Sequence, residues 1–176
     1  MKKTLLVAVL ALAVFAGTAQ AGSREFYKGG IYVTPQIGLN SWGGGLPFGA
    51  AVEYGLTENI GIGGSVMFDM WNETYWSSSL INFNADVAYH FTKIEAAKFD
   101  IYVGAGLGYS VYSYTYKTGY ENYSGVASSG IYIPIFAGAR YYFSPKMAVS
   151  LRLVGSLTGN WSGFGGVLGV TFALGK

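Results

Sequence analysis

The chain has 176 residues, of which 51% are hydrophobic and only 11% are charged, and its mean hydropathy is +0.33. About a quarter of the residues of an average soluble domain are charged, so this composition argues against an ordinary soluble domain. Eleven Lys and Arg against nine Asp and Glu give a net charge of +2, which does not indicate nucleic-acid binding. Cysteine is absent, so no disulfide framework is expected.

The first residues have the features of a secretory signal peptide. Lys2 and Lys3 precede an apolar run, and small residues occupy positions 19 and 21. The run is shorter than the roughly 20 residues of a membrane-spanning helix, and no later segment comes near that length. We predict that residues 1–21 are cleaved and that residues 22–176 form one domain. That domain would be formally neutral, with nine basic and nine acidic residues.

After a polar lead-in at residues 22–29, the chain repeats an alternation of apolar and other side chains with period two, which is typical of β-strands. The predicted strands are residues 31–40, 48–56, 60–70, 80–91, 99–114, 131–143, 147–154 and 163–174. Short turns at 57–59, 92–98 and 144–146 alternate with longer loops at 41–47, 71–79, 115–130 and 157–162. Outer-membrane barrels have this arrangement, with short periplasmic turns and longer external loops.

The hairpin at residues 131–154 indicates which face is outside. One face is continuously apolar, and the only charges within its strands, Arg140 and Arg152, lie on the opposite face. The chain has too few charges to solvate an exterior, so we predict that the apolar face contacts lipid. The predicted fold is an all-β, eight-stranded, antiparallel, up-and-down transmembrane β-barrel. The alternative is a soluble carrier barrel with its apolar face inside.

Aromatic residues lie toward both ends of the predicted strands, as in the girdles at lipid–water interfaces. Trp42, Trp71, Trp76 and Trp161 are at the loop end, and Tyr54, Phe91, Phe99, Tyr141, Phe143 and Phe172 are at the turn end. We predict that these ten residues form the two girdles.

The segments FGAAVEYGLTENIGIGG, YVGAGLGYS and AGARYYFSPKMAVSLRL give the mature chain a resemblance to the small outer-membrane β-barrel family that includes the OmpA transmembrane domain and the opacity-type proteins. The resemblance covers essentially the whole mature chain. It implies the same barrel architecture, and it specifies activity only weakly. Family members commonly end on an aromatic residue that the assembly machinery reads, whereas here four residues follow Phe172.

Four charged residues are predicted to face the lumen at similar heights: Glu53, Asp86, Arg140 and Arg152. An eight-stranded barrel has an interior just wide enough for side chains to fill, so we expect the two guanidiniums to pair with the two carboxylates across it. We interpret this network as a plug. The alternative is a gate in a narrow channel for ions or small molecules.

His90 is the only histidine, and Asp86 lies four residues away on the same strand face. That separation is roughly 13 Å along a strand, too long for a direct hydrogen bond. A lipid-modifying outer-membrane enzyme is therefore only a remote alternative, and we predict no catalytic residues. The Gly-rich segments at 61–64 and 104–108 do not join a strand to a helix, and no residues have metal-ligand spacing. We expect no cofactor.

The sequence thus predicts a non-enzymatic, porin-like or OmpA-like protein of the outer membrane of a Gram-negative-type bacterium. Its role is expected to be structural or to depend on its external loops. Expected partners are outer-membrane lipid including lipopolysaccharide, the barrel-assembly machinery, and a surface ligand bound through residues 71–79 and 115–130. We expect a monomer that does not bind nucleic acid.

Overall fold

The computed structural model describes residues 26–40, 45–92, 98–116, 125–158 and 164–174, and its strands belong to one antiparallel β-sheet. The strands are β1 (Ile31–Asn40), β2 (Phe48–Gly55), β3 (Ile60–Asn72), β4 (Trp76–His90), β5 (Phe99–Tyr116), β6 (Gly125–Tyr132), β7 (Pro134–Ser144), β8 (Met147–Ser156) and β9 (Phe164–Leu174). The predicted signal peptide lies outside the described residues. In the described part of the chain, no helix has the length and apolar character needed to cross a membrane.

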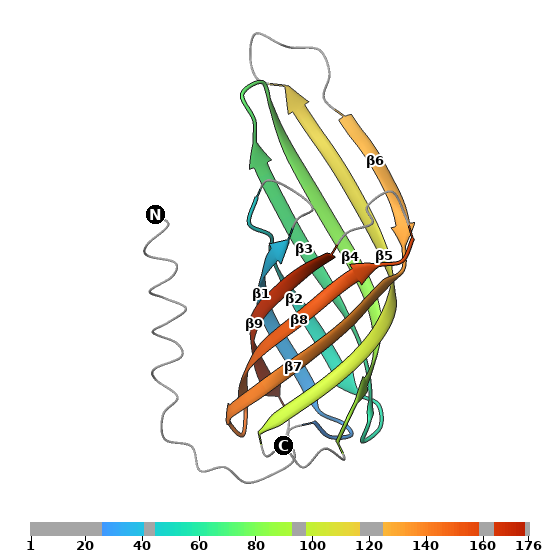
Figure 1. Ribbon diagram of the computed structural model, residues 1–176, viewed down its shortest axis with the longest axis vertical. Helices are drawn as coiled ribbons and strands as arrows, with labels where there is room; N and C mark the ends of the chain where they lie inside the picture. The colour runs from blue at the N-terminus through green and yellow to red at the C-terminus, as the bar shows by residue number, and fades with distance from the viewer. Residues whose placement is uncertain (1–25, 41–44, 93–97, 117–124, 159–163, 175–176) are drawn as a thin grey trace.

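The sheet closes on itself to form a barrel (Figure 1). Strand β1 pairs with β9, and β4 pairs with β5, so the ring of strands is complete. Strands β6 and β7 both lie along β5 in one register, and the break between them at Ile133 comes just before Pro134, which has no N–H to donate. They therefore act as one strand of the wall, and the predicted eight-stranded barrel is confirmed.

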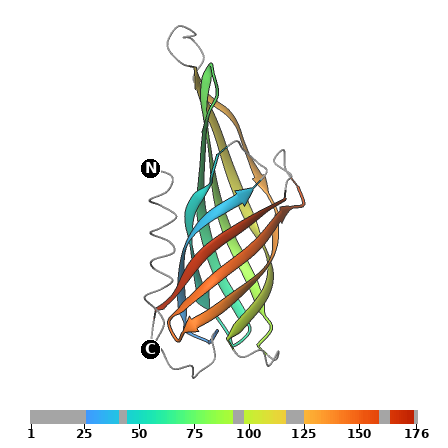
Figure 2. The same cartoon turned by 60° about the vertical axis from the view of Figure 1, so that its left-hand side comes forward.

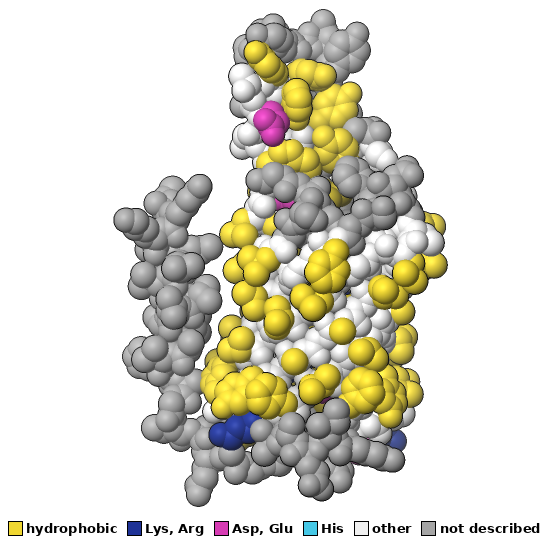
Figure 3. Space-filling model, viewed as in Figure 1, with side chains coloured by type: hydrophobic (Ala, Val, Ile, Leu, Met, Phe, Trp, Pro, Cys, Tyr) yellow, Lys and Arg dark blue, Asp and Glu magenta, His cyan; other side chains and the backbone are white. Residues whose placement is uncertain are grey.

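Apolar side chains cover the outside of the barrel. Val87 and Leu107 are 55% and 58% exposed, whereas His90 and Arg140, on the other face of the sheet, are buried. Figure 3 shows hydrophobic side chains over the visible wall, with acidic and basic side chains only toward the two ends. The predicted orientation of the strand faces is therefore present, and the alternative of a soluble carrier with an apolar interior is excluded.

Much of the two longest predicted loops is strand: residues 71–72, 76–79, 115–116 and 125–130 belong to strands, and residues 117–124 lie outside the described residues. The β3–β4 ladder continues to Asn72 and Ser77, the β4–β5 ladder continues to Trp76 and Tyr116, and β6 begins at Gly125. Four strands thus rise beyond the rim of the barrel (Figures 1 and 2). We call this part the extension: residues 70–80, 111–116 and 125–130, with the turn between β3 and β4. Its serine- and tyrosine-rich composition is polar enough to indicate a loop, although its backbone forms strands.

The lead-in, where it is described, crosses the short-turn end of the barrel. The N–H of Gly29 donates to the carbonyl of Gly55 at 2.7 Å, and the N–H of Gly55 donates to the carbonyl of Gly30 at 2.9 Å. Gly29 has a φ of +84°, a conformation that glycine adopts without steric cost. The chain therefore turns at this point, and the preceding Phe26 is buried at the mouth of the lumen.

Candidate functional site: the charged lumen

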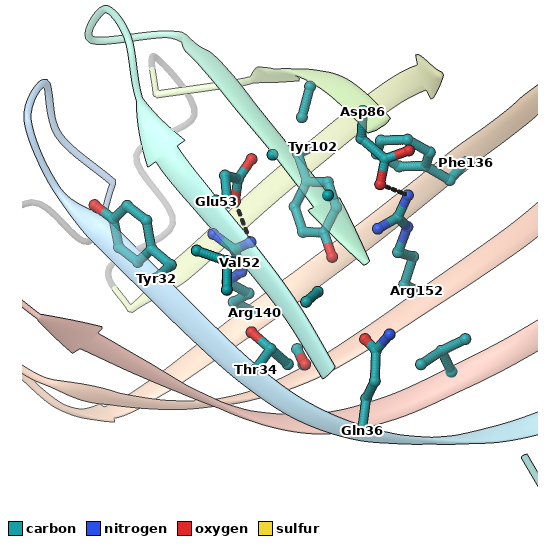
Figure 4. Close-up of a pocket in the computed structure, with 16 residues that line it drawn as sticks. Tyr32, Thr34, Gln36, Val52, Glu53, Asp86, Tyr102, Phe136, Arg140 and Arg152 are labelled. Atoms are coloured by element: carbon teal, nitrogen blue, oxygen red, sulfur yellow. Dashed lines mark hydrogen bonds and ion pairs between the residues drawn. The ribbon is translucent and has the colours of Figure 1, made fainter. Parts of the chain in front are cut away.

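The lumen is the place where the fold concentrates its charges. Inward-facing positions of β2, β4, β5, β7 and β8 bring them together from distant parts of the sequence (Figure 4). We divide them into the lower cluster, made of Glu53, His90, Asp100 and Arg140 at the short-turn end, and the upper pair, made of Asp86 and Arg152 nearer the extension.

The lower cluster is a closed set of ion pairs. The guanidinium of Arg140 donates to a carboxylate oxygen of Glu53 and, at 3.3 Å, to Oδ2 of Asp100. His90 lies between the same two carboxylates, with Nδ1 2.7 Å from Asp100 Oδ1 and Nε2 3.0 Å from Glu53 Oε1. Each carboxylate therefore contacts both Arg140 and His90, and the four side chains form a ring of contacts.

The geometry also fixes the number of protons in the cluster. An ionised carboxylate only accepts hydrogen bonds, so two ionised carboxylates require a hydrogen on both nitrogens of His90. With both carboxylates ionised, the lower cluster has two negative and two positive groups. If one proton moves from His90 to a carboxyl group, one negative and one positive group remain. The cluster is neutral as a whole in both arrangements. Such neutrality is what a group of charges removed from water requires.

Aromatic rings surround the lower cluster. Phe26, which is 2% exposed, stacks on the fully buried His90 with 3.5 Å between ring centroids and 5° between planes. The guanidinium of Arg140 lies 5.2 Å from the ring of Tyr32 and 4.9 Å from that of Tyr102. These contacts favour a cation over the ring faces.

The upper pair is simpler and less completely satisfied. Arg152 donates to Oδ2 of Asp86 at 2.8 Å, and its guanidinium lies 3.5 Å from the centroid of the Phe136 ring. Oδ1 of Asp86 and Nε of Arg152 are buried without a hydrogen-bond partner in the protein. Two cavities of about 40 and 60 Å³ border this region, and Arg152 lines both. A volume of this size holds about three or four water molecules.

Glycines make room for the rings that fill the lumen. A Cβ at Gly138 would lie 2.4 Å from the ring of Tyr102, its partner on β5, and a Cβ at Gly108 would lie 2.3 Å from the ring of Tyr132. Neither ring could keep its position if these glycines carried side chains. The small residues on the lumenal face therefore allow cross-strand aromatic packing.

The structure pairs the four charged residues singled out in the sequence as two separate ion pairs, Glu53 with Arg140 and Asp86 with Arg152. Sequence reasoning did not find Asp100, and it assigned His90 to no network. The alternation along β5 could have identified Asp100, because this residue has the same parity as the inward glycines 104–108. That Asp100 lies opposite Arg140, however, follows only from the register of the β5–β7 ladder, which the sequence does not give.

The predictions for the two aromatic girdles have different outcomes. At the turn end, Tyr54, Phe91, Phe99 and Tyr141 are exposed on the outer wall, and Phe143 and Phe172 are partly exposed there. Figure 3 shows hydrophobic side chains gathered around this end. Trp71 and Trp76 do not belong to an outer girdle, because they occupy inward positions of β3 and β4. Trp42 and Trp161 lie outside the described residues.

His90 is enclosed by the other members of the lower cluster. Both of its nitrogens contact carboxylates, and the ring is completely buried. As the sequence predicted from their separation, Asp86 is not a partner of His90 and contacts Arg152 instead. In the described part of the chain, no group of three or more His, Asp or Glu side chains could hold a metal ion.

Comparison with known proteins supports the fold without naming a family. No protein-family model matches the chain, and no curated protein matches it by sequence. Among solved structures, the chain is similar to the outer-membrane protein OprG of Pseudomonas aeruginosa, with a TM-score of 0.69 and 8% identity over 88% of this chain and 100% of that one. The fold is that of the small outer-membrane β-barrels.

Two further structures agree. The N-terminal β-barrel domain of OprF from Pseudomonas aeruginosa has a TM-score of 0.61 and 18% identity, over 84% of this chain and 98% of that chain. Ail, the attachment invasion locus protein of Yersinia pestis, has a TM-score of 0.58 and 15% identity, over 84% of this chain and 99% of that one. At these identities, the similarity to small outer-membrane β-barrels shows the architecture of this chain alone.

Proposed function

We propose that this protein is an integral outer-membrane β-barrel whose lumen is plugged and which acts through the extension. The observation that carries this proposal is the inverted distribution of side chains. Exposed Val87, Leu107 and Leu151 cover the wall, while the ion pairs of Arg140 and Arg152 lie inside. Such a surface is stable against hydrocarbon and would aggregate in water.

The plug is supported by the packing of the lower cluster. Phe26, Tyr32 and Tyr102 pack around the cluster, and all three rings are buried. Moving an ion through this layer would require separating charges that neutralise one another. The alternative of a narrow channel is favoured by one observation: the smaller cavity borders Tyr102 and Arg140 of this layer and shares Gln36, Arg152 and Val167 with the larger one.

The role of the extension is supported by its position beyond the rim, at the end opposite the short turns (Figure 2). Among similar structures, Ail of Yersinia pestis has been solved with a heparin analogue, sucrose octasulfate, and in a phospholipid nanodisc. We propose that the present chain likewise resides in lipid, including lipopolysaccharide, and binds a surface ligand through residues 71–79 and 115–130. We further propose a monomer without catalytic activity, exported by a signal peptide cleaved after Ala21 and inserted by the barrel-assembly machinery.

The test begins with the location of the protein in its native cell. We expect it to fractionate with outer membranes, to migrate differently on gels before and after boiling, and to begin at Gly22 by N-terminal sequencing. In planar bilayers the refolded protein should give no stable single-channel openings. Monodisperse solubility without detergent would contradict the membrane location, stable conductance would favour the channel, and altered lipopolysaccharide in extracted lipid would favour an enzyme.

A further inference from the structure

The extension has two different faces. The registers of the β3–β4 and β4–β5 ladders show no shift from the barrel to their ends, so the inward parity of the lumen continues above the rim. The inward positions of these strands carry five aromatic residues, which we call the aromatic shelf: Trp71, Trp76, Tyr112, Tyr114 and Tyr116. The opposite face carries Met70, Ser77, Ser79 and Ser113.

The rings of the shelf form a row rather than a scattered set. Trp71 stacks on Tyr112 with 5.8 Å between centroids and 21° between planes, although β4 lies between their strands. Tyr112 is 6.5 Å from Tyr114, and Tyr114 is 5.6 Å from Tyr116. The row is possible because Ser78, on β4 between the first two rings, is small, buried and bonded to the hydroxyl of Tyr112 at 3.0 Å.

The charges around the shelf select against anions. Among the described residues of the extension, none is Lys or Arg, and the acidic residues are Glu73 in the β3–β4 turn and Asp69 at the base of the shelf. Asp69 is 1% exposed, and both of its carboxylate oxygens lack a hydrogen-bond partner in the protein. The described residues of the extension therefore offer no counter-charge to a sulfated or phosphorylated ligand.

The shape of the shelf selects against a small cation. Quaternary ammonium groups are bound in cages, where several rings enclose one centre. Here the rings follow one another along the sheet: Trp71 and Tyr112 are near-parallel with centroids 5.8 Å apart, and Tyr114 follows at 6.5 Å from Tyr112. A row of ring faces, edged by tyrosine and serine hydroxyls, suits an elongated ligand that has both apolar C–H faces and hydroxyl groups.

Resting on the proposed function, which places the extension outside the cell, we propose that the aromatic shelf binds an uncharged oligosaccharide. The C–H groups of a sugar ring have partial positive charge and pack on the negative faces of aromatic rings. The sugar hydroxyls can exchange hydrogen bonds with Ser128, which lies opposite Tyr112 on β6, and with the hydroxyl of Tyr114. The shelf faces the barrel axis, whereas lipopolysaccharide of the same membrane surrounds the outer wall. The ligand is therefore carried by a molecule outside the membrane.

The experiment uses the full mature chain in phospholipid nanodiscs without lipopolysaccharide. Cellohexaose, maltohexaose and chitohexaose are titrated in calorimetry and examined by saturation-transfer NMR, beside sucrose octasulfate and phosphocholine. We expect at least one neutral hexasaccharide to bind, with its ring C–H protons receiving the saturation. Tyr114→Ala and Trp71→Leu should each raise Kd about tenfold, since each removes a ring face. The matched control is Met70→Ala, on the opposite face, which should leave Kd unchanged.

Each other outcome overturns the proposal. Binding of sucrose octasulfate or phosphocholine alone would assign the shelf to an anion or a cation, and absence of binding by all three hexasaccharides would remove the sugar. Equal Kd for Tyr114→Ala and Met70→Ala would place the sugar elsewhere. Heat-modifiable migration of each sample shows that the barrel is folded in lipid. A failure of the oligosaccharide proposal is thus distinguished from a failure of the membrane assignment.

Discussion

The lower cluster and the upper pair contain the same kinds of charged group in one lumen, yet they differ in how completely they are satisfied. In the lower cluster two cationic side chains meet two carboxylates, and Phe26 covers them. In the upper pair one guanidinium meets one carboxylate, and Oδ1 of Asp86 lacks a protein partner. Arg152 lines two cavities, of which only the smaller also borders Glu53 and Arg140 of the lower cluster.

This difference shows that an ion pair inside a barrel is not by itself a measure of stability. The cost of losing one partner depends on how many charges are left uncompensated. At the lower cluster the loss of Arg140 leaves two carboxylates that share His90. At the upper pair the loss of Arg152 leaves one carboxylate, which borders a cavity. Substitutions of similar chemistry should therefore have different effects at the two levels of the lumen.

The largest effect is expected for Arg140→Met, which leaves two carboxylates facing one His90. Removing one partner of a buried ion pair typically lowers the free energy of unfolding by about 3–5 kcal/mol, and we expect a loss of this size. Urea unfolding in lipid vesicles, followed by the shift in gel migration, measures it. Arg140→Lys keeps the charge and should lose less. A change below about 1 kcal/mol for Arg140→Met would contradict the closed-ring description of the cluster.

The second effect is that of His90→Asn. The substitution removes one positive group and leaves Glu53 and Asp100 sharing only Arg140. Since charged hydrogen bonds are each worth about 1.5–3 kcal/mol, we expect the free energy of unfolding to fall by about 2–3 kcal/mol in the same assay. Adding Asp100→Asn should restore part of the loss, because one carboxylate is then neutral. If the double variant is less stable than His90→Asn alone, the charge balance is not the reason.

A smaller effect is expected for Arg152→Gln. Asp86 loses its guanidinium, but it borders a cavity of about 40 Å³ that can hold water beside the carboxylate. We therefore expect a loss of about 1–2 kcal/mol in the free energy of unfolding. The comparison with Arg140→Gln, made on the same scale, is decisive: equal losses at the two positions would mean that the number of charges left uncompensated does not set the cost.

The smallest effect on global stability is expected for Phe26→Ala. The lead-in can leave the lumen while the ring of strands stays intact, so the free energy of unfolding should change by less than about 1 kcal/mol. Locally, hydrogen exchange at the amides of Gly29 and Gly55 should accelerate, because their bonds hold the lead-in in place. Lys28→Ala, at an exposed neighbour, is the control. Unchanged exchange in Phe26→Ala would show that the stacking on His90 does not retain this segment.

The barrel could be predicted from the sequence because its wall has a strict physical requirement. Every strand must present apolar side chains to one side, and a one-residue slip would reverse the faces. The alternation of residues 131–154 therefore defines both strands and orientation. The extension escaped prediction for the complementary reason. Neither of its faces must be apolar, so Ser77 to Ser79 and residues 115–116 form strands without the pattern that identifies them.

The lumen could be predicted only in part. Parity identified Glu53, Asp86, Arg140 and Arg152 as inward residues, and the number of residues from each turn gave their approximate heights. The inclusion of Asp100 and His90 depends on which strands are neighbours and on ring packing, neither of which parity contains. Phe26 precedes the first strand and belongs to no alternation. Its position is set by the bonds of Gly29 and Gly30 to Gly55.

The seat of Phe26 has a consequence for the order of assembly. Its ring packs on Tyr32 of β1 and His90 of β4, and the backbone that follows it is hydrogen-bonded to Gly55 of β2. These strands are joined through β3 in the sheet, so the ring has a place to insert only when β1 to β4 have paired. A segment that precedes every strand in the sequence thus takes its position from strands that follow it.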